Sequence, residues 1–235
     1  MIPQTKPAFI NSTKSLPVKE PTDEEFECFR KLVLAELGLN WAGDKKYLLY
    51  ARLQRRLQYL KLSTFRDYHD YLQNQNNGIE LQHLYNAVTT TKSGFYREKQ
   101  HFELLRQEIF PEMKEQMIRK RKKIRFWSAG CACGEDAFNL AIEAHDFLGP
   151  KLTSGGGLRI LASDVNTSVL ESAEKGQYTV EQVSPVPVEF RNRYFNSGRG
   201  LQKENYMIRM DIRKLIQFRH FNLMASEYPI ATKFQ

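Results

Sequence analysis

Apolar positions in the first part of the chain recur at the spacing of amphipathic helices. Thr22 and Glu25 have the spacing of a capping box, and Gly38 suits a C-terminal cap, so residues 22–38 predict a helix. The apolar residues between these caps fall on one helical face: Phe26, Phe29, Val33 and Leu37.

A second helix is predicted over the segment "DKKYLLYARLQRRLQYLK". At about 100° per residue, its apolar residues form one stripe, which consists of Tyr50, Leu53, Leu57 and Leu60. Three basic residues lie opposite: Arg52, Arg55 and Arg56. Two shorter helices follow, one from Ser63 or Thr64 through Tyr71 and one from Ile79 to Val88. Residues 22–92 therefore predict a small helical domain with one basic face.

Residues 93–122 are interpreted as a linker region of further helix, broken or bent at Pro111. The region ends in a cationic run, Arg119 to Lys123. This run is interpreted either as a solvated helix end that connects two domains or as a nucleic-acid patch. No aromatic residue is interleaved in the run for bases to stack on, which favours the connector.

From residue 123 the pattern changes to alternating strands and helices. The predicted elements are a strand at 123–128, a helix at 135–149, a turn at 154–157, a strand at 158–164 and a helix at 166–176. This order indicates an α/β domain, residues 123–235, with a parallel sheet. Ile208, Met210 and Ile212 then alternate with polar residues, which predicts a strand with one solvated face. We interpret residues 206–220 as a small antiparallel hairpin within a β-subdomain at about 190–220.

The composition limits the classes of protein. Apolar residues make up 41% of the chain, enough for a core, and no apolar run approaches the ~20 residues of a membrane span, so no membrane insertion is expected. Residues 1–21 are interpreted as a flexible arm. Three cysteines, two of them one residue apart, form no disulfide framework and indicate a reducing cytoplasm. The net charge of +8 indicates an acidic partner.

Small residues gather where the first strand of the α/β domain gives way to a helix. In "SAGCACGED", Gly130, Ala132 and Gly134 would let the backbone approach a ligand, and the helix start offers free N–H groups. The second strand ends in Asp164, placed to accept hydrogen bonds from ribose hydroxyls. The combination predicts a nucleoside cofactor.

The acids at the start of this helix help to choose the cofactor. Glu135 and Asp136 would repel the pyrophosphate of a dinucleotide, whereas S-adenosylmethionine carries an ammonium, a sulfonium and no phosphate. The charges therefore favour S-adenosylmethionine over NAD. A zinc site at Cys131 and Cys133 is disfavoured because no second pair of ligands accompanies them, and we predict no metal.

The sequence resembles the CheR family of chemoreceptor glutamate methyltransferases over roughly residues 23–224. The likeness is carried by "NAVTTTKSGFYREKQHFELL", "RFWSAGCACGEDAFNLAI", "ILASDVNTSVLESAEKGQY", the basic helix and the segment "RNRYF". The resemblance implies a helical N-terminal domain, then a Rossmann-like methyltransferase domain with an inserted antiparallel β-subdomain. The implied activity is methyl esterification of glutamates on receptor cytoplasmic domains by S-adenosylmethionine, with S-adenosylhomocysteine as product.

The same resemblance implies roles for individual residues. Glu135 and Asp164 match the acidic cofactor ligands, with the backbone of Gly130, Ala132 and Gly134 beside them, and Arg97 matches the active-site arginine. Asn222, followed by Leu223, matches the residue that helps to hold the adenine. Ser93 replaces a typical Thr and keeps a hydroxyl, whereas Thr91 replaces a typical Asn and loses an amide.

The resemblance also implies surfaces for the receptor. Arg52, Arg55 and Arg56 would steer the enzyme to an acidic receptor helix bundle. The hairpin at 206–220 corresponds to a β-subdomain that docks a receptor C-terminal peptide in some members. No nucleic-acid partner is expected, although an RNA methyltransferase stays a weaker alternative, suggested only by the sequence pI of about 9.3 and the cationic run Arg119 to Lys123.

The chain departs from the family after "HFNLM". The family continues with a strand of the type "FDxIFCRN" and a helix carrying a tyrosine, whereas this chain continues "ASEYPIATKFQ". The C-terminal part of the domain is therefore expected to be missing, which would leave the strand at 124–128 with an unpaired edge. Two explanations stay open: a fragment of an enzyme, or a truncated non-catalytic module that binds S-adenosylmethionine, S-adenosylhomocysteine or a receptor.

Overall fold

The computed structural model describes residues 17–41, 43–74, 78–198, 205–228 and 234. The chain forms two compact units, residues 1–88 and 89–235. Residues 1–16 of the predicted arm lie outside the described residues. The rest of that arm, 17–21, is not free: Val18 and Pro21 are buried, and the Lys19 N–H donates to the Ser63 carbonyl at 2.9 Å. For these five residues the arm prediction was wrong, because Val18 completes the apolar core of the helical unit.

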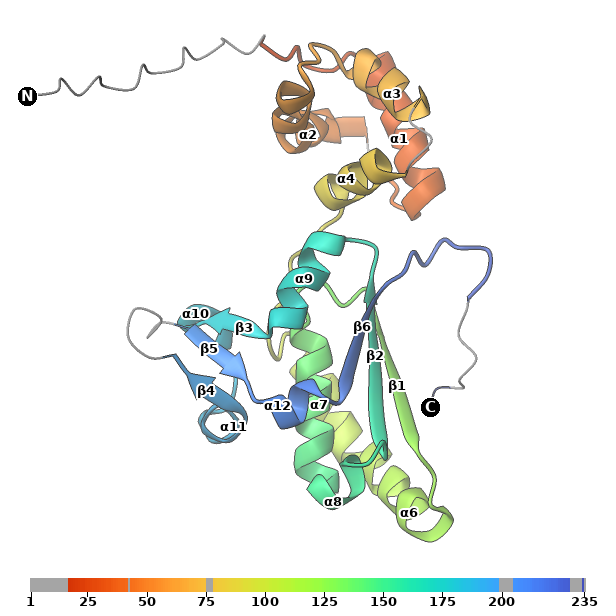
Figure 1. The fold of residues 1–235 in the computed structure, drawn as a ribbon. Helices are drawn as coiled ribbons and strands as arrows, with labels where there is room; N and C mark the ends of the chain where they lie inside the picture. Colours follow the sequence, from red (N-terminus) through yellow and green to blue (C-terminus); the bar gives the residue numbers. More distant parts are fainter. Residues whose placement is uncertain (1–16, 42, 75–77, 199–204, 229–233, 235) are drawn as a thin grey trace, which may run out of the picture. The chain divides into compact units, whose positions relative to one another are not determined.

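The N-terminal unit is helical, as predicted (Figure 1). Its elements are α1 (Asp23–Leu37), the short 3-10 turn η1 (Gly43–Lys45), α2 (Lys46–Leu60), α3 (Phe65–Asn74) and α4 (Ile79–Val88). The capping box forms, with the Thr22 N–H donating to Glu25 at 2.8 Å and the Glu25 N–H to Thr22 at 3.2 Å. The α2 stripe is rotated from the prediction: Leu49 is fully buried with Leu53 and Leu57, whereas Tyr50 and Leu60 are half-buried.

The second unit begins with a long irregular helix. It comprises α5 (Lys99–Leu104), a π-helical turn η2 (Leu105–Ile109) and α6 (Phe110–Lys120). The irregularity precedes Pro111, which sits in the first turn of α6, where a missing N–H costs nothing. The predicted break at the proline is therefore a π-helical turn on its N-terminal side.

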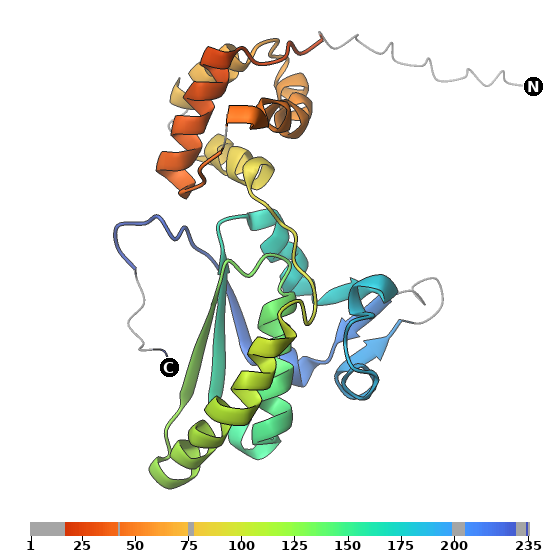
Figure 2. The same cartoon turned by 180° about the vertical axis from the view of Figure 1, so that it is seen from behind.

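A parallel sheet forms the centre of the second unit, in the order β1-β2-β6. Its strands and helices are β1 (Ile124–Ala129), α7 (Glu135–Leu148), α8 (Pro150–Thr153), β2 (Leu158–Asp164), α9 (Thr167–Lys175) and β6 (Ile216–His220). Ile124 pairs with Leu158, and Ile160 with Ile216. Helices α6 and α7 lie over one face of the sheet (Figures 1 and 2). Within the described residues β1 pairs with β2 alone.

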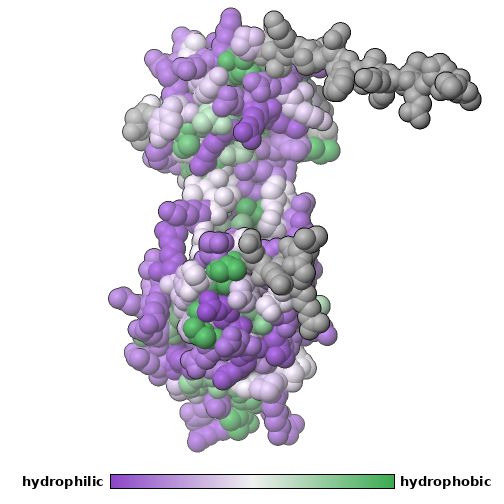
Figure 3. All heavy atoms as spheres, turned by 90° about the vertical axis from the view of Figure 1, so that its left-hand side faces the viewer, coloured by the Kyte–Doolittle hydropathy of each residue, from purple (hydrophilic) through white to green (hydrophobic). Residues whose placement is uncertain are grey.

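A small antiparallel sheet, in the order β3-β5-β4, stands beside the main one. It contains β3 (Gln177–Thr179), α10 (Val180–Val183), α11 (Val188–Tyr194), β4 (Phe195–Ser197) and β5 (Asn205–Ile208), and α12 (Met210–Arg213) then leads into β6. The surface on this side is mostly hydrophilic, with scattered apolar side chains (Figure 3).

The predicted hairpin at 206–220 was wrong in its pairing. Residues 216–220 join the main sheet as β6, and β5 pairs with β3 and β4 instead. The alternation across residues 208–213 was also misleading. Ile208 and Ile212 are buried, but they are four residues apart, a spacing that a helical turn satisfies as well as a strand does.

No helix among the described residues has the length and apolar content needed to cross a membrane.

Candidate functional site

The turn between β1 and α7 has an unusual backbone. Gly130, Ala132 and Gly134 all have positive φ, at 69°, 46° and 90°. A Cβ at Gly134 would lie 3.0 Å from the Ala173 Cβ, so only glycine fits there. A Cβ at Gly130 would meet nothing within 4 Å, so the backbone at this point is open to a ligand.

Asp164, at the end of β2, fixes this turn. Its Oδ2 accepts the Ala132 N–H and its Oδ1 accepts the Asn166 N–H, both at 2.8 Å. The carboxylate thus joins the turn after β1 to the start of α9. Each oxygen has a further lone pair, which leaves capacity for a ribose hydroxyl.

Glu135, the first residue of α7, is a buried acid with an unused acceptor. The residue is 3% exposed, and neither its Oε2 nor the buried Ser93 Oγ has a hydrogen-bond partner among the described residues. Burial raises the pKa of the Glu135 carboxyl, and its own N–H and the nearby Ser93 hydroxyl offset this only partly. The two side chains are close enough to interact electrostatically without reaching hydrogen-bond geometry. A cationic donor would satisfy both.

The segment 89–97 makes contacts with three parts of the second unit: the start of α9, β3 and α7. The Asn166 side chain donates to the Thr89 hydroxyl at 2.9 Å, and the Phe95 ring lies 4.8 Å from that of Tyr178. The Tyr96 hydroxyl donates to Glu143 on α7 at 2.9 Å.

The three predicted site residues of this segment, Thr91, Ser93 and Arg97, are close in sequence to the residues that make these contacts. Thr91 and Arg97 are exposed, whereas Ser93 faces Glu135. Loss of solvent raises the pKa of the Asp136 carboxyl, and the Arg97 guanidinium lowers it in part, so the arginine lies within electrostatic range of the start of α7.

Asn222 and Leu223 follow β6 at the same edge. The Phe221 N–H donates to the Asp164 carbonyl at 3.0 Å, and Asn222 Oδ1 accepts the Met224 N–H at 2.9 Å. Leu223 is 45% exposed. The predicted cofactor residues of the turn, with Glu135, Asp164, Asn222 and Leu223, therefore gather where the carboxyl ends of β1, β2 and β6 meet, which is where α/β sheets bind ligands.

The three arginines of α2 belong to the other unit and differ in their surroundings. Arg56 forms a bidentate ion pair with Glu80, with its Nη2 2.5 Å from the Glu80 Oε2. Arg52 donates to the Val88 carbonyl. Arg55 is exposed. Two of the three side chains thus make contacts inside the helical unit.

The two cysteines of the turn are free thiols, Cys131 buried and Cys133 half-buried. Burial raises the pKa of the Cys131 thiol to about 12, which disfavours its thiolate form at neutral pH. Across the described ranges, no group of three or more His, Cys, Asp or Glu is arranged to hold a metal ion.

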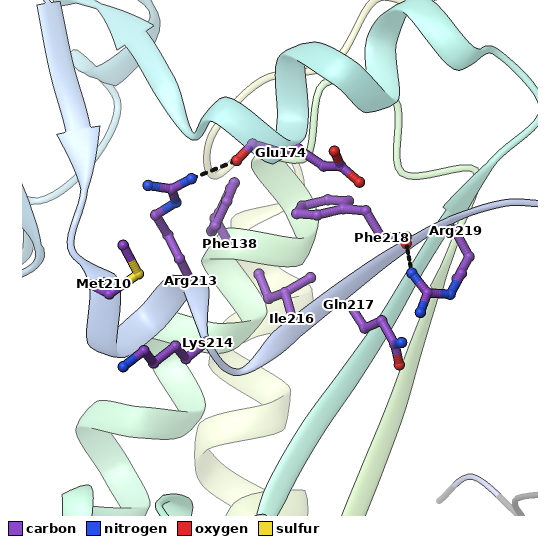
Figure 4. A pocket seen from close by; sticks show the side chains of 9 residues that line it. All are labelled: Phe138, Glu174, Met210, Arg213, Lys214, Ile216, Gln217, Phe218 and Arg219. Atoms are coloured by element: carbon purple, nitrogen blue, oxygen red, sulfur yellow. Dashed lines mark hydrogen bonds between the residues drawn. The ribbon is translucent and has the colours of Figure 1, made fainter.

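A separate hollow of about 330 Å³ runs along β6 (Figure 4). Its lining comes from α7, α9, α12 and β6: Phe138, Glu174, Met210, Arg213, Lys214, Ile216, Gln217, Phe218 and Arg219. Arg213 donates to the Glu174 carbonyl at 2.7 Å and Arg219 to the Phe218 carbonyl at 2.9 Å, so both guanidinium groups already contact backbone. The hollow shares none of its lining with the predicted cofactor residues.

The residues that hydrogen-bond to the backbone of the turn between β1 and α7 were not identified from the sequence. The Tyr178 hydroxyl donates to the Cys133 carbonyl at 2.7 Å, and the Ser163 carbonyl accepts the Cys131 N–H at 2.9 Å. Ser163 directly precedes Asp164, so the reasoning that selected Asp164 as the last residue of a strand could also have selected Ser163. Tyr178 lies forty-five positions from Cys133 and gave no local signal.

The residues present fit S-adenosylmethionine. The buried, unpartnered Glu135 Oε2 suits an ammonium, Asp164 retains acceptor capacity, and the backbone at Gly130 is open. A parallel sheet with this acidic edge is the arrangement expected of an S-adenosylmethionine-dependent methyltransferase.

Comparison with known proteins specifies the family. Residues 91–235 match the CheR methyltransferase SAM binding domain, and residues 24–89 match the CheR methyltransferase all-alpha domain. The chain therefore belongs to the CheR methyltransferase family, which confirms the predicted resemblance, fold class and cofactor.

Individual relatives agree. The chain is 31% identical over 210 residues to chemotaxis protein methyltransferase 2 of Pseudomonas aeruginosa, covering 89% of this chain and 71% of the relative. It is 30% identical over 213 residues to the chemotaxis protein methyltransferase of Escherichia coli, covering 91% and 71%. The corresponding protein of Borreliella burgdorferi is 28% identical over 214 residues, covering 91% and 74%.

Proposed function

We propose that this protein transfers a methyl group from S-adenosylmethionine to glutamate side chains of chemoreceptor cytoplasmic domains, forming glutamate methyl esters. Family membership supports the reaction class. The observation that carries the proposal is the buried Glu135 carboxylate with a free acceptor at the carboxyl edge of the sheet. It is suited to a cationic cofactor.

The reaction needs placement more than acid–base chemistry. Bound S-adenosylmethionine supplies an electrophilic methyl group on a sulfonium. A glutamate side chain, with a reference pKa of about 4.3, is ionised at neutral pH and attacks without a general base. The protein's task is to orient the two reactants, and placement alone can lower a barrier by about 7–11 kcal/mol. Arg97, exposed near the start of α7, is assigned to clamp the substrate carboxylate through its planar guanidinium.

The other site residues are assigned to the cofactor. Glu135, with Ser93 beside it, accepts hydrogen bonds from the ammonium group of the cofactor, and Asp164 accepts hydrogen bonds from its ribose hydroxyls. Asn222, Leu223 and Thr91 line the rest of the site, together with the backbone of the turn. The contacts of Ser93, Glu135 and Asp164 described above support these roles.

Receptor binding is assigned to the two remaining predicted surfaces. The basic face of α2, formed by Arg52, Arg55 and Arg56, attracts the acidic helix bundle of the receptor, and Arg55 is the exposed cation of the three. The small β3-β5-β4 sheet is the surface proposed for a receptor C-terminal peptide. The protein would act in the cytoplasm, where the receptor's methylated domains lie, without nucleic acid or membrane insertion.

The assignment of Arg97 is tested with Arg97→Ala in the full chain. Methyl transfer to receptor, measured as base-labile ester, should be abolished, while calorimetry with S-adenosylhomocysteine still shows binding. Arg119→Ala is the matched control, since Arg119 is 76% exposed on α6 and pairs with Glu115 of its own helix. Unchanged methylation in Arg97→Ala would remove Arg97 from the mechanism. Tight binding by the unaltered chain without any transfer would instead identify a non-catalytic module.

A further inference from the structure

The segment that carries Ser93 and Arg97 is fastened to α7 by a tyrosine between them. The Tyr96 hydroxyl donates to Glu143 Oε1 at 2.9 Å, and Glu143 Oε2 accepts from Arg106 Nε at 2.8 Å. The Glu143 side chain is only 7% exposed, so both of its oxygens are used away from bulk water. Hydrogen bonds to a carboxylate in such surroundings are strong.

Tyr96 has a backbone conformation that it would not adopt unaided. Its φ is 53°, in the left-handed region that a bulky side chain rarely occupies. Burial and then the Glu143 carboxylate raise the pKa of Tyr96, so the hydroxyl keeps its proton and remains a donor. The bond to Glu143 therefore acts directly on the strained residue next to Arg97.

Glu143, which accepts the Tyr96 hydrogen bond, is held in place by Arg106. Arg106 lies in the π-helical turn η2, and its Nη2 also donates to Asp146 at 2.7 Å. The Tyr194 hydroxyl of α11 donates to the same Asp146 at 2.9 Å. Glu143 and Asp146 are three residues apart on α7, and Arg106 spans them. Tyr194 belongs to the same network, but in the described part of the chain its hydroxyl bonds to Asp146 and not to the segment 93–97.

We propose that Tyr96, held by Glu143 and Arg106, is a positioning residue that sets where Ser93 and Arg97 stand relative to Glu135. This inference rests on the proposed function, because Ser93 and Arg97 are site residues there. Tyr96 touches no reacting atom. It fixes the turn at 95–98 so that its neighbours reach the cofactor and the substrate carboxylate.

The test is Tyr96→Phe in the full chain, with Tyr194→Phe as the matched control. Amide hydrogen exchange over residues 93–98, measured without ligand, should accelerate about tenfold in Tyr96→Phe and stay within about twofold in Tyr194→Phe. The dissociation constant for S-adenosylhomocysteine should rise about tenfold at unchanged stoichiometry. A merely structural hydroxyl would lower the stoichiometry and leave the dissociation constant as it was.

A double-mutant cycle checks the connection. In a Glu143→Gln background, with a weaker neutral acceptor, Tyr96→Phe should add less than threefold to the exchange rate. Full additivity, or unchanged exchange at 93–98 in the single variant, would overturn the proposal. If the unaltered chain binds no S-adenosylhomocysteine, the proposed function fails, yet the exchange measurement still decides the role of Tyr96.

Discussion

Replacing Glu135 by glutamine should make the ligand-free protein more stable and its cofactor binding weaker. Glu135 is 3% exposed, and its Oε2 has no hydrogen-bond partner within the described part of the chain. Leaving such a group unpaired costs about 1–3 kcal/mol. Its position at the start of α7 offsets part of this cost, because the helix dipole stabilises a negative charge there by about 0.3–1 kcal/mol. Removing the charge should therefore raise the free energy of unfolding by about 1 kcal/mol, or about 3 °C in Tm.

The effect on binding has the opposite sign. A hydrogen bond from the cofactor's ammonium to a carboxylate contributes about 1.5–3 kcal/mol, so Glu135→Gln should weaken S-adenosylhomocysteine binding by roughly ten- to a hundredfold. Calorimetry on the full chain measures the affinity, and chemical denaturation without ligand measures the stability.

The gain in stability should also depend on pH. The folded-state pKa of Glu135 is raised above its ordinary value of 4.5, so the folded protein holds that proton more tightly than the unfolded chain. This contribution to stability is complete below pH 4.5 and is lost as the pH rises through the folded-state pKa. The difference between variant and unaltered protein should thus be near zero at acidic pH and largest at neutral pH.

Asp136→Asn is the matched control, since it removes an acid from the same helix start at an exposed position. Loss of solvent raises the pKa of Asp136 as well, but the Arg97 guanidinium offsets part of that shift, so Asp136→Asn should gain less stability than Glu135→Gln and leave the affinity for S-adenosylhomocysteine unchanged. The reasoning about Glu135 fails if the glutamine variant is less stable at neutral pH, because the carboxylate would then have a structural partner. It fails equally if affinity for S-adenosylhomocysteine is unchanged.

Two further predictions concern the turn and the helical unit. Gly134→Ala should destabilise the second unit by about 2 kcal/mol in chemical denaturation, because its φ is 90° and the new Cβ would lie 3.0 Å from Ala173. Arg56→Ala should lower the stability of the helical unit by about 2 kcal/mol, since it strands the Glu80 carboxylate, which is 6% exposed. Arg55→Ala should leave the melting temperature unchanged but raise KM for receptor and flatten its salt dependence; an unchanged KM would remove Arg55 from the receptor surface.

The helices and the main sheet were predictable because local signals agreed with the fold. The capping box at Thr22 and Glu25 and the αL glycine at Gly38 marked both ends of α1 without tertiary information. Asn166 caps α9 and Gly176 ends it for the same reason. Such contacts span three or four residues, so the sequence pattern contains them in full.

The errors arose where pairing partners are distant. The segment 205–220 contains one strand of each sheet, β5 and β6, separated by the turn α12. The alternation at 208–212 runs into the helical turn α12, so it marked neither where the strands end nor which strand lies beside them, because pairing depends on distant contacts such as that of Tyr178 with Tyr206. The arm was misjudged in the same way, since Val18 is buried only by residues much later in the helical unit.

The two acids at the start of α7 show what the structure adds to a predicted site. In the sequence Glu135 and Asp136 are equivalent, and both argue against a phosphate. In the fold loss of solvent raises the pKa of both carboxyls, but Glu135 faces inward with an acceptor that has no partner among the described residues, whereas Asp136 is exposed and the Arg97 guanidinium offsets part of its shift. A buried unpaired carboxylate destabilises the ligand-free protein, so packing gives no reason for an acid at this position. A bound cation does give one, and the glutamine variant tests both halves of this argument: a gain in stability shows that the acid has no structural partner, and a loss of affinity for S-adenosylhomocysteine shows that it serves the ligand.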